Sequence, residues 1–220
     1  MMKCNRSATP DFLETHGATW SSDWVSKCED SDENKSSKFS WGSHSGKYIN
    51  HLILEHLRGM TSNHCSYCDG YPLNVTGFET IDHFKPKGKG EYPELSYIWN
   101  NLYLACEKCQ GHKKSRYEDK LLRPDDPRYE FDNHFIYNEI NGEIEPNPTA
   151  IEEDRNRALC SIDIFGLNQG GRPSARKREL KKFRSLYAIR EHGEFNDWPF
   201  RFLLINEIDE IASGLRTEMN

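Results

Sequence analysis

Residues 65–68, CSYC, and residues 83–117, HFKPKGKGEYPELSYIWNNLYLACEKCQGHKKSRY, decide the fold of this chain. They contain two Cys-x-x-Cys pairs, formed by Cys65, Cys68, Cys106 and Cys109. Two intervening residues let both thiolates of a pair face one ion, and four thiolates close a tetrahedral Zn²⁺ site without a position for substrate. The sequence therefore predicts a structural zinc site that joins two segments distant in the chain.

The separation of the two pairs adds a second constraint. Thirty-seven residues lie between Cys68 and Cys106, more than in a simple zinc ribbon, so the intervening loop must form a substructure of its own. Free thiols and a redox dithiol are the alternatives for these pairs, but neither pair lies in a thioredoxin-like βαβ pattern. The other three cysteines lack a partner at such spacing, and we expect them to be free: Cys4, Cys28 and Cys160.

Four motifs follow one another in this region. After the first cysteine pair come Asp82-His83 with Pro86 three positions later, then Asn101, then the second pair and a following lysine. This order resembles the HNH nucleases, which share the ββα-metal fold. Residues 83–117 are also similar to the HNH subunit of Septu-type bacterial anti-phage systems, which occurs beside some retrons. The resemblance implies an α+β fold, with a small ββα-metal core, a four-cysteine zinc site and flanking N- and C-terminal helices.

The resemblance assigns roles to three residues. It implies that His83 is the general base and that Asp82 holds a catalytic divalent cation, Mg²⁺ or Mn²⁺. A histidine suits its role because an unperturbed pKa of about 6.5 lets it take a proton from water near neutral pH. Asn101 matches the middle Asn of the family motif, and its side-chain carbonyl would hold the His83 ring in the useful tautomer. The alternative role for Asn101 is a helix N-cap or turn.

One position departs from the family pattern. HNH nucleases usually have His or Asn directly after the second cysteine pair, as a second ligand of the catalytic metal, whereas this chain has Gln110. Gln110 also offers a carbonyl oxygen, one methylene further out. His112 offers an imidazole, but two residues along a helix turn it by about 200° to another face. Gln110 and His112 both remain candidates, and a missing catalytic metal would leave a binding module.

Charge is unevenly distributed along the chain. The 220 residues carry 29 basic and 35 acidic side chains, and a net charge of −6 taken globally disfavours nucleic acid. Between residues 84 and 116, however, seven basic residues stand against three acidic ones. We expect contacts with the nucleic acid backbone from Lys85, Lys87, Lys113, Lys114 and Arg116. DNA and RNA, tRNA included, both stay open as substrates because the sequence has no base-reading motif.

A second basic run covers residues 172–184, where seven basic residues accompany a single acid, Glu179. The run has two interpretations. It contacts nucleic acid, or it forms a solvated helix face or a surface for an acidic partner.

We divide the chain into three parts: residues 1–46, 47–117 and 118–220. The first is a polar arm, broken by a solvated loop at 29–37. Its three tryptophans either cap the core of the same chain or dock on a partner: Trp20, Trp24 and Trp41.

The second part is the nuclease core, and the third continues the same globule. The core begins with an amphipathic helix at 47–60. The third part contains a hairpin around Asn141-Gly142. Further helices are predicted at 149–166, 173–192 and 197–213.

Three functions compete. The first is a metal-dependent HNH endonuclease, the effector of a bacterial defence complex in which the resemblance implies an ATPase subunit. The second is a zinc-knuckle module that binds nucleic acid or a partner without turnover. The third is a structural subunit whose tryptophan arm and basic helix serve assembly. Because the sequence lacks an 18-residue apolar run and an apolar signal-peptide core, we expect no membrane span and a cytoplasmic location.

Overall fold

The computed structural model describes residues 1–30, 38–75, 77–189, 191 and 193–212, so most of the predicted loop at 29–37 lies outside the described residues. The fold is α+β with small sheets. The described helices, in chain order, are α1 (Asp11–Glu29), α2 (Ile49–Thr61), α3 (Glu107–Lys113), α4 (Phe131–His134), α5 (Glu152–Phe165), α6 (Arg172–Ala188) and α7 (Arg201–Ala212). The strands are β1 (Ser43–His44), β2 (Lys47–Tyr48), β3 (Glu79–His83), β4 (Leu102–Cys106), β5 (Phe135–Asn138) and β6 (Glu143–Pro146).

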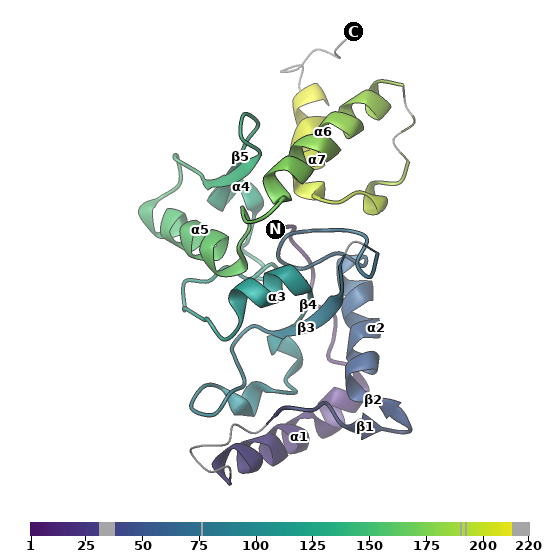
Figure 1. Cartoon of the computed structure of the whole chain (residues 1–220), viewed down its shortest axis with the longest axis vertical. Helices are drawn as coiled ribbons and strands as arrows, with labels where there is room; N and C mark the ends of the chain where they lie inside the picture. The colour runs from purple at the N-terminus through teal and green to yellow at the C-terminus, as the bar shows by residue number, and fades with distance from the viewer. Residues whose placement is uncertain (31–37, 76, 190, 192, 213–220) are drawn as a thin grey trace.

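The centre of the molecule is an antiparallel hairpin of β3 and β4, followed directly by α3 (Figure 1). Its register pairs Glu79 with Cys106 at one end and His83 with Leu102 at the other. All five residues of β4 are buried, as expected for the apolar sequence LYLAC. The strand ends at Cys106, whose side chain accepts a hydrogen bond from the backbone N–H of Cys109 and so caps α3. The two cysteines of this pair therefore lie where strand becomes helix.

Helical segments close the two ends of this centre. Figure 1 shows α1 with the β1–β2 hairpin at one end, and α6 with α7 at the other. One core cluster joins α1, α2 and β4, with Leu13, Ile53 and Leu104 among its members. Another surrounds the cysteines and includes Phe135 and Phe165 from the C-terminal part. Because Leu102 and Leu104 belong to the first cluster and Tyr103 and Ala105 to the second, the two faces of the hairpin are buried by different parts of the chain.

No helix was predicted before residue 47, whereas residues 11–29 of the polar arm form the 19-residue helix α1. Its apolar positions were too sparse to reveal a helix. A Cβ at Gly17 would lie 2.9 Å from the carbonyl oxygen of Tyr97, so a glycine lets α1 approach the loop before β4. Trp24 is buried and its indole N–H donates to the carbonyl of Lys87 at 2.8 Å. Trp24 therefore caps the core of its own chain.

The C-terminal predictions agree with the structure apart from their boundaries. β5 and β6 form the hairpin around Asn141-Gly142. α5 ends at Phe165, and Gly166 after it adopts φ 59° and closes the helix as a left-handed cap. α6 ends at residue 188, earlier than predicted, and α7 begins at residue 201 and not at 197. Among the described helices, none has the length and apolar character needed to cross a membrane.

Candidate metal centre and active site

The four predicted zinc ligands lie together and are buried. The Sγ atoms of Cys65, Cys68, Cys106 and Cys109 are all within 4.8 Å of one another. Cys68 Sγ and Cys106 Sγ are 3.8 Å apart. A tetrahedral ion with Zn–S bonds of about 2.3 Å requires sulfur atoms about 3.8 Å apart. The donor set and its spacing therefore fit a Zn²⁺ ion held by four thiolates.

Backbone groups orient the sulfur atoms. The N–H of Cys106 donates to Cys65 Sγ at 3.3 Å, and the N–H of Cys109 donates to Cys106 Sγ at 3.4 Å. A Cβ at Gly70 would lie 3.2 Å from Cys68 Sγ, so the knuckle turns closely past the thiol. N–H donors favour the deprotonated sulfur that metal binding requires.

A residue outside the predicted ligand set also contacts the sulfur atoms. Arg172, the first residue of α6, places Nη2 3.2 Å from Cys109 Sγ and 3.8 Å from Cys106 Sγ. The sequence showed a basic run here but gave no sign that its first member turns inward.

Asp82 lies on β3 and is 2% exposed. Its Oδ2 atom accepts a 2.6 Å hydrogen bond from the Tyr67 hydroxyl and lies 3.2 Å from Lys113 Nζ. Burial raises the pKa of Asp82 above its ordinary value, although Lys113 and Tyr67 act in the opposite direction. The Lys113 side chain is fully buried and also donates to the carbonyl of His83 at 2.6 Å. Lys113 is therefore the counter-charge of Asp82.

His83 has one ring nitrogen held by the backbone. Its Nε2 lies 2.9 Å from the carbonyl oxygen of Ser96. Because a carbonyl only accepts, Nε2 must carry the proton, which leaves a lone pair on Nδ1 in the neutral ring. Burial lowers the pKa of His83 well below its ordinary value, and the charges of Lys87 and Lys113 add to this effect. The ring is therefore neutral near pH 7 and has the tautomer that a base at Nδ1 requires.

Two aromatic side chains from the segment before α2 cover this histidine. Trp41 stacks on the His83 ring, with centroids 5.2 Å apart and planes 15° from parallel. Phe39 meets the same ring edge-on at 5.5 Å. The Tyr97 hydroxyl lies 3.0 Å from the carbonyl oxygen of Trp41 and ties the cover to the loop before β4. His83 is only 6% exposed as a result. We call Phe39 and Trp41 the aromatic cover.

Asn101 is buried close to this site but bonds elsewhere. Its Oδ1 accepts from the backbone N–H of Lys85 at 2.7 Å, and its Nδ2 donates to the carbonyls of Lys85 and Leu95. These bonds hold the loop that follows His83 against the loop that carries Ser96. The backbone carbonyl of Ser96 has the contact with the His83 ring that was predicted for Asn101.

The predicted ligands of a catalytic divalent cation do not assemble around Asp82. The Gln110 side chain donates from Nε2 to the carbonyl of Ile81 at 3.0 Å. His112 is exposed, and a Cβ at Gly166 would lie 2.5 Å from its Cγ, so its ring packs against the end of α5. Among the described residues, His, Cys, Asp and Glu side chains come together in groups of three or more only at the four cysteines, and Asp82 is not part of that group. Gln110 and His112 therefore do not lie with Asp82 as ligands of one cation, and the catalytic Mg²⁺ or Mn²⁺ stays a prediction.

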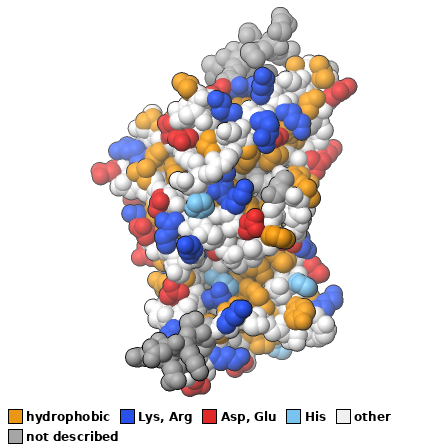
Figure 2. Space-filling model, viewed as in Figure 1, with side chains coloured by type: hydrophobic (Ala, Val, Ile, Leu, Met, Phe, Trp, Pro, Cys, Tyr) orange, Lys and Arg blue, Asp and Glu red, His pale blue; other side chains and the backbone are white. Residues whose placement is uncertain are grey.

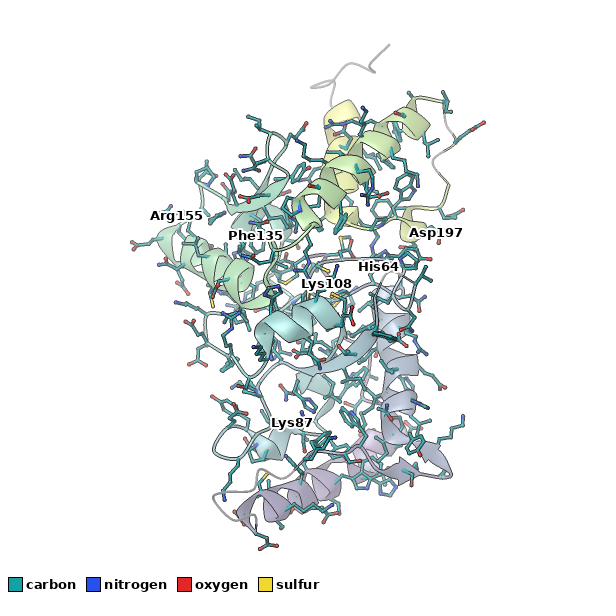
Figure 3. The ribbon with its side chains drawn as sticks, viewed as in Figure 1. His64, Lys87, Lys108, Phe135, Arg155 and Asp197 are labelled. Atoms are coloured by element: carbon teal, nitrogen blue, oxygen red, sulfur yellow. The ribbon has the colours of Figure 1, made fainter. Side chains whose placement is uncertain are left out.

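The residues predicted to contact nucleic acid divide into buried and exposed groups. Lys113 is fully buried, which removes it from a surface role. Lys85 lies 4.8 Å over the Tyr92 ring, and Lys87 lies 4.6 Å over the Phe39 ring. Arg116 pairs with Asp163 at 2.9 Å. Lys114 is exposed at the end of α3, and Figures 2 and 3 show further cationic side chains near α3, where Lys108 is labelled.

The second basic run is also divided. Arg172 and Arg176 are buried. Arg184 pairs with Glu139 and Glu207. The exposed cations of α6 are Lys177, Arg178, Lys181 and Lys182.

No family model matches the sequence. The chain is 29% identical over 128 residues to Septu protein PtuB of Bacillus mycoides, covering 52% of this chain and 42% of that protein. It is 34% identical over 80 residues to Septu protein PtuB of Bacillus thuringiensis, covering 36% of this chain and 27% of that protein. The matches thus span less than half the length of these curated relatives. They support the predicted relationship to the Septu-type family.

Proposed function

We propose that this chain is a nuclease component of a Septu-type defence system and hydrolyses phosphodiester bonds of nucleic acid through an HNH-type site. The proposal is carried by one observation: His83 Nε2 is fixed on the Ser96 carbonyl, so that Nδ1 of a neutral ring holds the basic lone pair. The similarity to two Septu proteins supports the defence assignment. An ATPase subunit as partner is part of the proposal and rests on the resemblance to Septu-type systems.

His83 would take the proton of the attacking water at Nδ1. The imidazolium formed would keep its Nε2–H on the Ser96 carbonyl, so the ring keeps its orientation during the transfer. The positive charge of Lys87 acts on the His83 ring, and such charge favours a phosphate group and the anionic transition state. The aromatic cover must move before a substrate reaches Nδ1, because His83 is 6% exposed.

The test compares wild type, His83→Ala and His112→Ala, each purified with the ATPase partner. His112 is the matched control, an exposed histidine on α3. Plasmid DNA, single-stranded DNA and total RNA with tRNA are incubated with Mg²⁺, with Mn²⁺ and with EDTA. We expect cleavage by wild type and by His112→Ala, and loss of at least 100-fold in His83→Ala. Equal cleavage by His83→Ala would refute the role of His83, and the EDTA arm decides the metal requirement.

A second candidate function is a binding module without turnover. The observation that favours it is the Asp82–Lys113 pair, at 3.2 Å, where HNH nucleases have a metal ligand. In this case nucleic acid would be bound but not cut by the complex under every metal condition. Binding measured by electrophoretic mobility shift, with no cleavage in any arm, would favour this candidate over the nuclease.

A further inference from the structure

Two arginines at the start of the basic run are buried, and the burial of their charges needs an explanation. Arg172 is 7% exposed and Arg176 is fully buried. A guanidinium keeps its charge in a protein, and a buried charge is costly unless an opposite charge lies near it. Among the described residues, neither arginine forms an ion pair with a carboxylate. The compensating charge must come from another kind of group.

The cysteine cluster is the anionic group within reach. Arg172 Nη2 lies 3.2 Å from Cys109 Sγ, at the distance of a charge-assisted hydrogen bond to sulfur. Its Nη1 donates to the carbonyl of Gly166, which fixes the plane of the guanidinium against the cluster. Four thiolates around one Zn²⁺ leave a doubly negative site.

Arg176 lies one helical turn after Arg172 and provides a second positive charge on the same face of α6. Its polar contacts are neutral oxygens, namely the carbonyls of Gly142 and Leu167 and the side chain of Asn168. These contacts hold the guanidinium in place without neutralising it. The two positive charges of these arginines therefore balance the two negative charges of the zinc site.

We propose that Arg172, assisted by Arg176, is the counter-cation of the zinc tetrathiolate, so that metal binding and docking of α6 on the zinc knuckle form one linked equilibrium. Figure 3 shows sulfur atoms between α3 and α6, where this contact forms. With zinc bound, the arginines stabilise the site and the site stabilises α6. Without zinc nothing holds the four sulfur atoms at one point, so the guanidinium of Arg172 loses the site on which it docks. The inference is independent of nuclease activity.

The first test measures zinc affinity in the full chain by competition with a chromogenic chelator. Arg172→Met keeps much of the side-chain volume and removes the charge, and Arg172→Lys retains a charge. The matched control is Arg178→Met, which changes an exposed arginine of the same helix that pairs with Glu179. We expect affinity to fall 10- to 100-fold in Arg172→Met, as for other groups that contact metal ligands. The zinc affinity of Arg172→Lys should fall less, and the zinc affinity of Arg178→Met should equal that of wild type.

The second test needs no variant and covers the case in which Arg172→Met fails to fold. Hydrogen exchange of the wild-type chain is compared before and after zinc removal. We expect amides of α6 to lose protection on metal loss, whereas those of α1 at the opposite end change less. Unchanged zinc affinity in Arg172→Met, or α6 protection unaffected by zinc removal, would overturn the proposal.

Discussion

The two ends of the β3–β4 hairpin differ in what completes them. At the end where Glu79 pairs with Cys106, four sulfur atoms gather within 4.8 Å and α6 adds Arg172. At the other end, His83 pairs with Leu102 and is completed by Ser96 and Trp41. The cysteines of the first end have to lie together because they would bind one ion. The second end is completed by residues of many types from a loop and from the aromatic cover, so packing sets its arrangement.

Loss of zinc should have the largest effect on stability of all these changes, because the ion holds together the four cysteines of the first end. Structural Zn²⁺ contributes about 10–16 kcal/mol in small zinc domains. Cys106→Ser should therefore abolish zinc binding and the cooperative unfolding of the segments that pack around the cysteines, with less effect on α1 and α2. Cys4→Ser, at a half-buried cysteine outside the cluster, is the control and should bind zinc normally. Zinc content and thermal unfolding with and without a chelator provide the measurement, and a cooperative, zinc-free Cys106→Ser protein would contradict the structural role.

The second end should respond most strongly to loss of its buried charge pair. Lys113→Met leaves the Asp82 carboxylate without its counter-charge at 2% exposure, and breaking such a pair costs about 3–5 kcal/mol. Asp82→Asn strands the ammonium in the same way. The double variant Asp82→Asn/Lys113→Met should recover part of the loss, because neither charge remains. Urea unfolding of the four proteins measures this coupling, and additive losses would show that the two charges do not depend on each other.

The contrast between the ends also explains what the sequence could reveal. The spacing of Cys65, Cys68, Cys106 and Cys109 predicts their cluster because one ion has to satisfy all four. Asp82 and His83 were found through a motif, but the burial of Lys113 could not be read from its charge. Trp41 was recognised as an aromatic in a polar segment, yet its stacking on His83 depends on α1 and the loop at Tyr97. Where the role of a residue depends on several segments of the chain, the sequence around that residue does not predict it.

The neutral, buried state of His83 predicts a dependence of stability on pH. Its pKa is lowered in the folded protein, chiefly by burial, so below about pH 6.5 the unfolded chain binds the proton that the folded chain does not. This contribution to stability is complete above that pH and is lost as the pH falls toward the folded pKa. The free energy of unfolding should fall by up to about 1.4 kcal/mol per pH unit in this window.

His83→Gln isolates this contribution. His134 also has a lowered pKa because of burial, and it adds a pH dependence of the same sign to both proteins. The difference between wild type and His83→Gln, measured by urea unfolding at pH 7.5, 6.0 and 5.0, cancels the His134 contribution. Parallel curves for the two proteins would mean that His83 titrates normally in the folded state.

Removal of the aromatic cover should have the smallest effect on stability and a specific effect on His83. Trp41 is half-buried, and a stacked aromatic pair contributes about 0.5–1.5 kcal/mol beyond its buried area. Trp41→Ala opens one face of the imidazole while Ser96 still holds Nε2. Diethyl pyrocarbonate should then modify His83 several-fold faster, as read by peptide mass spectrometry, with the exposed His112 as internal reference. If the His83 rate matched that of wild type, the cover would not control access, and the second end of the hairpin would be closed by its own loops alone.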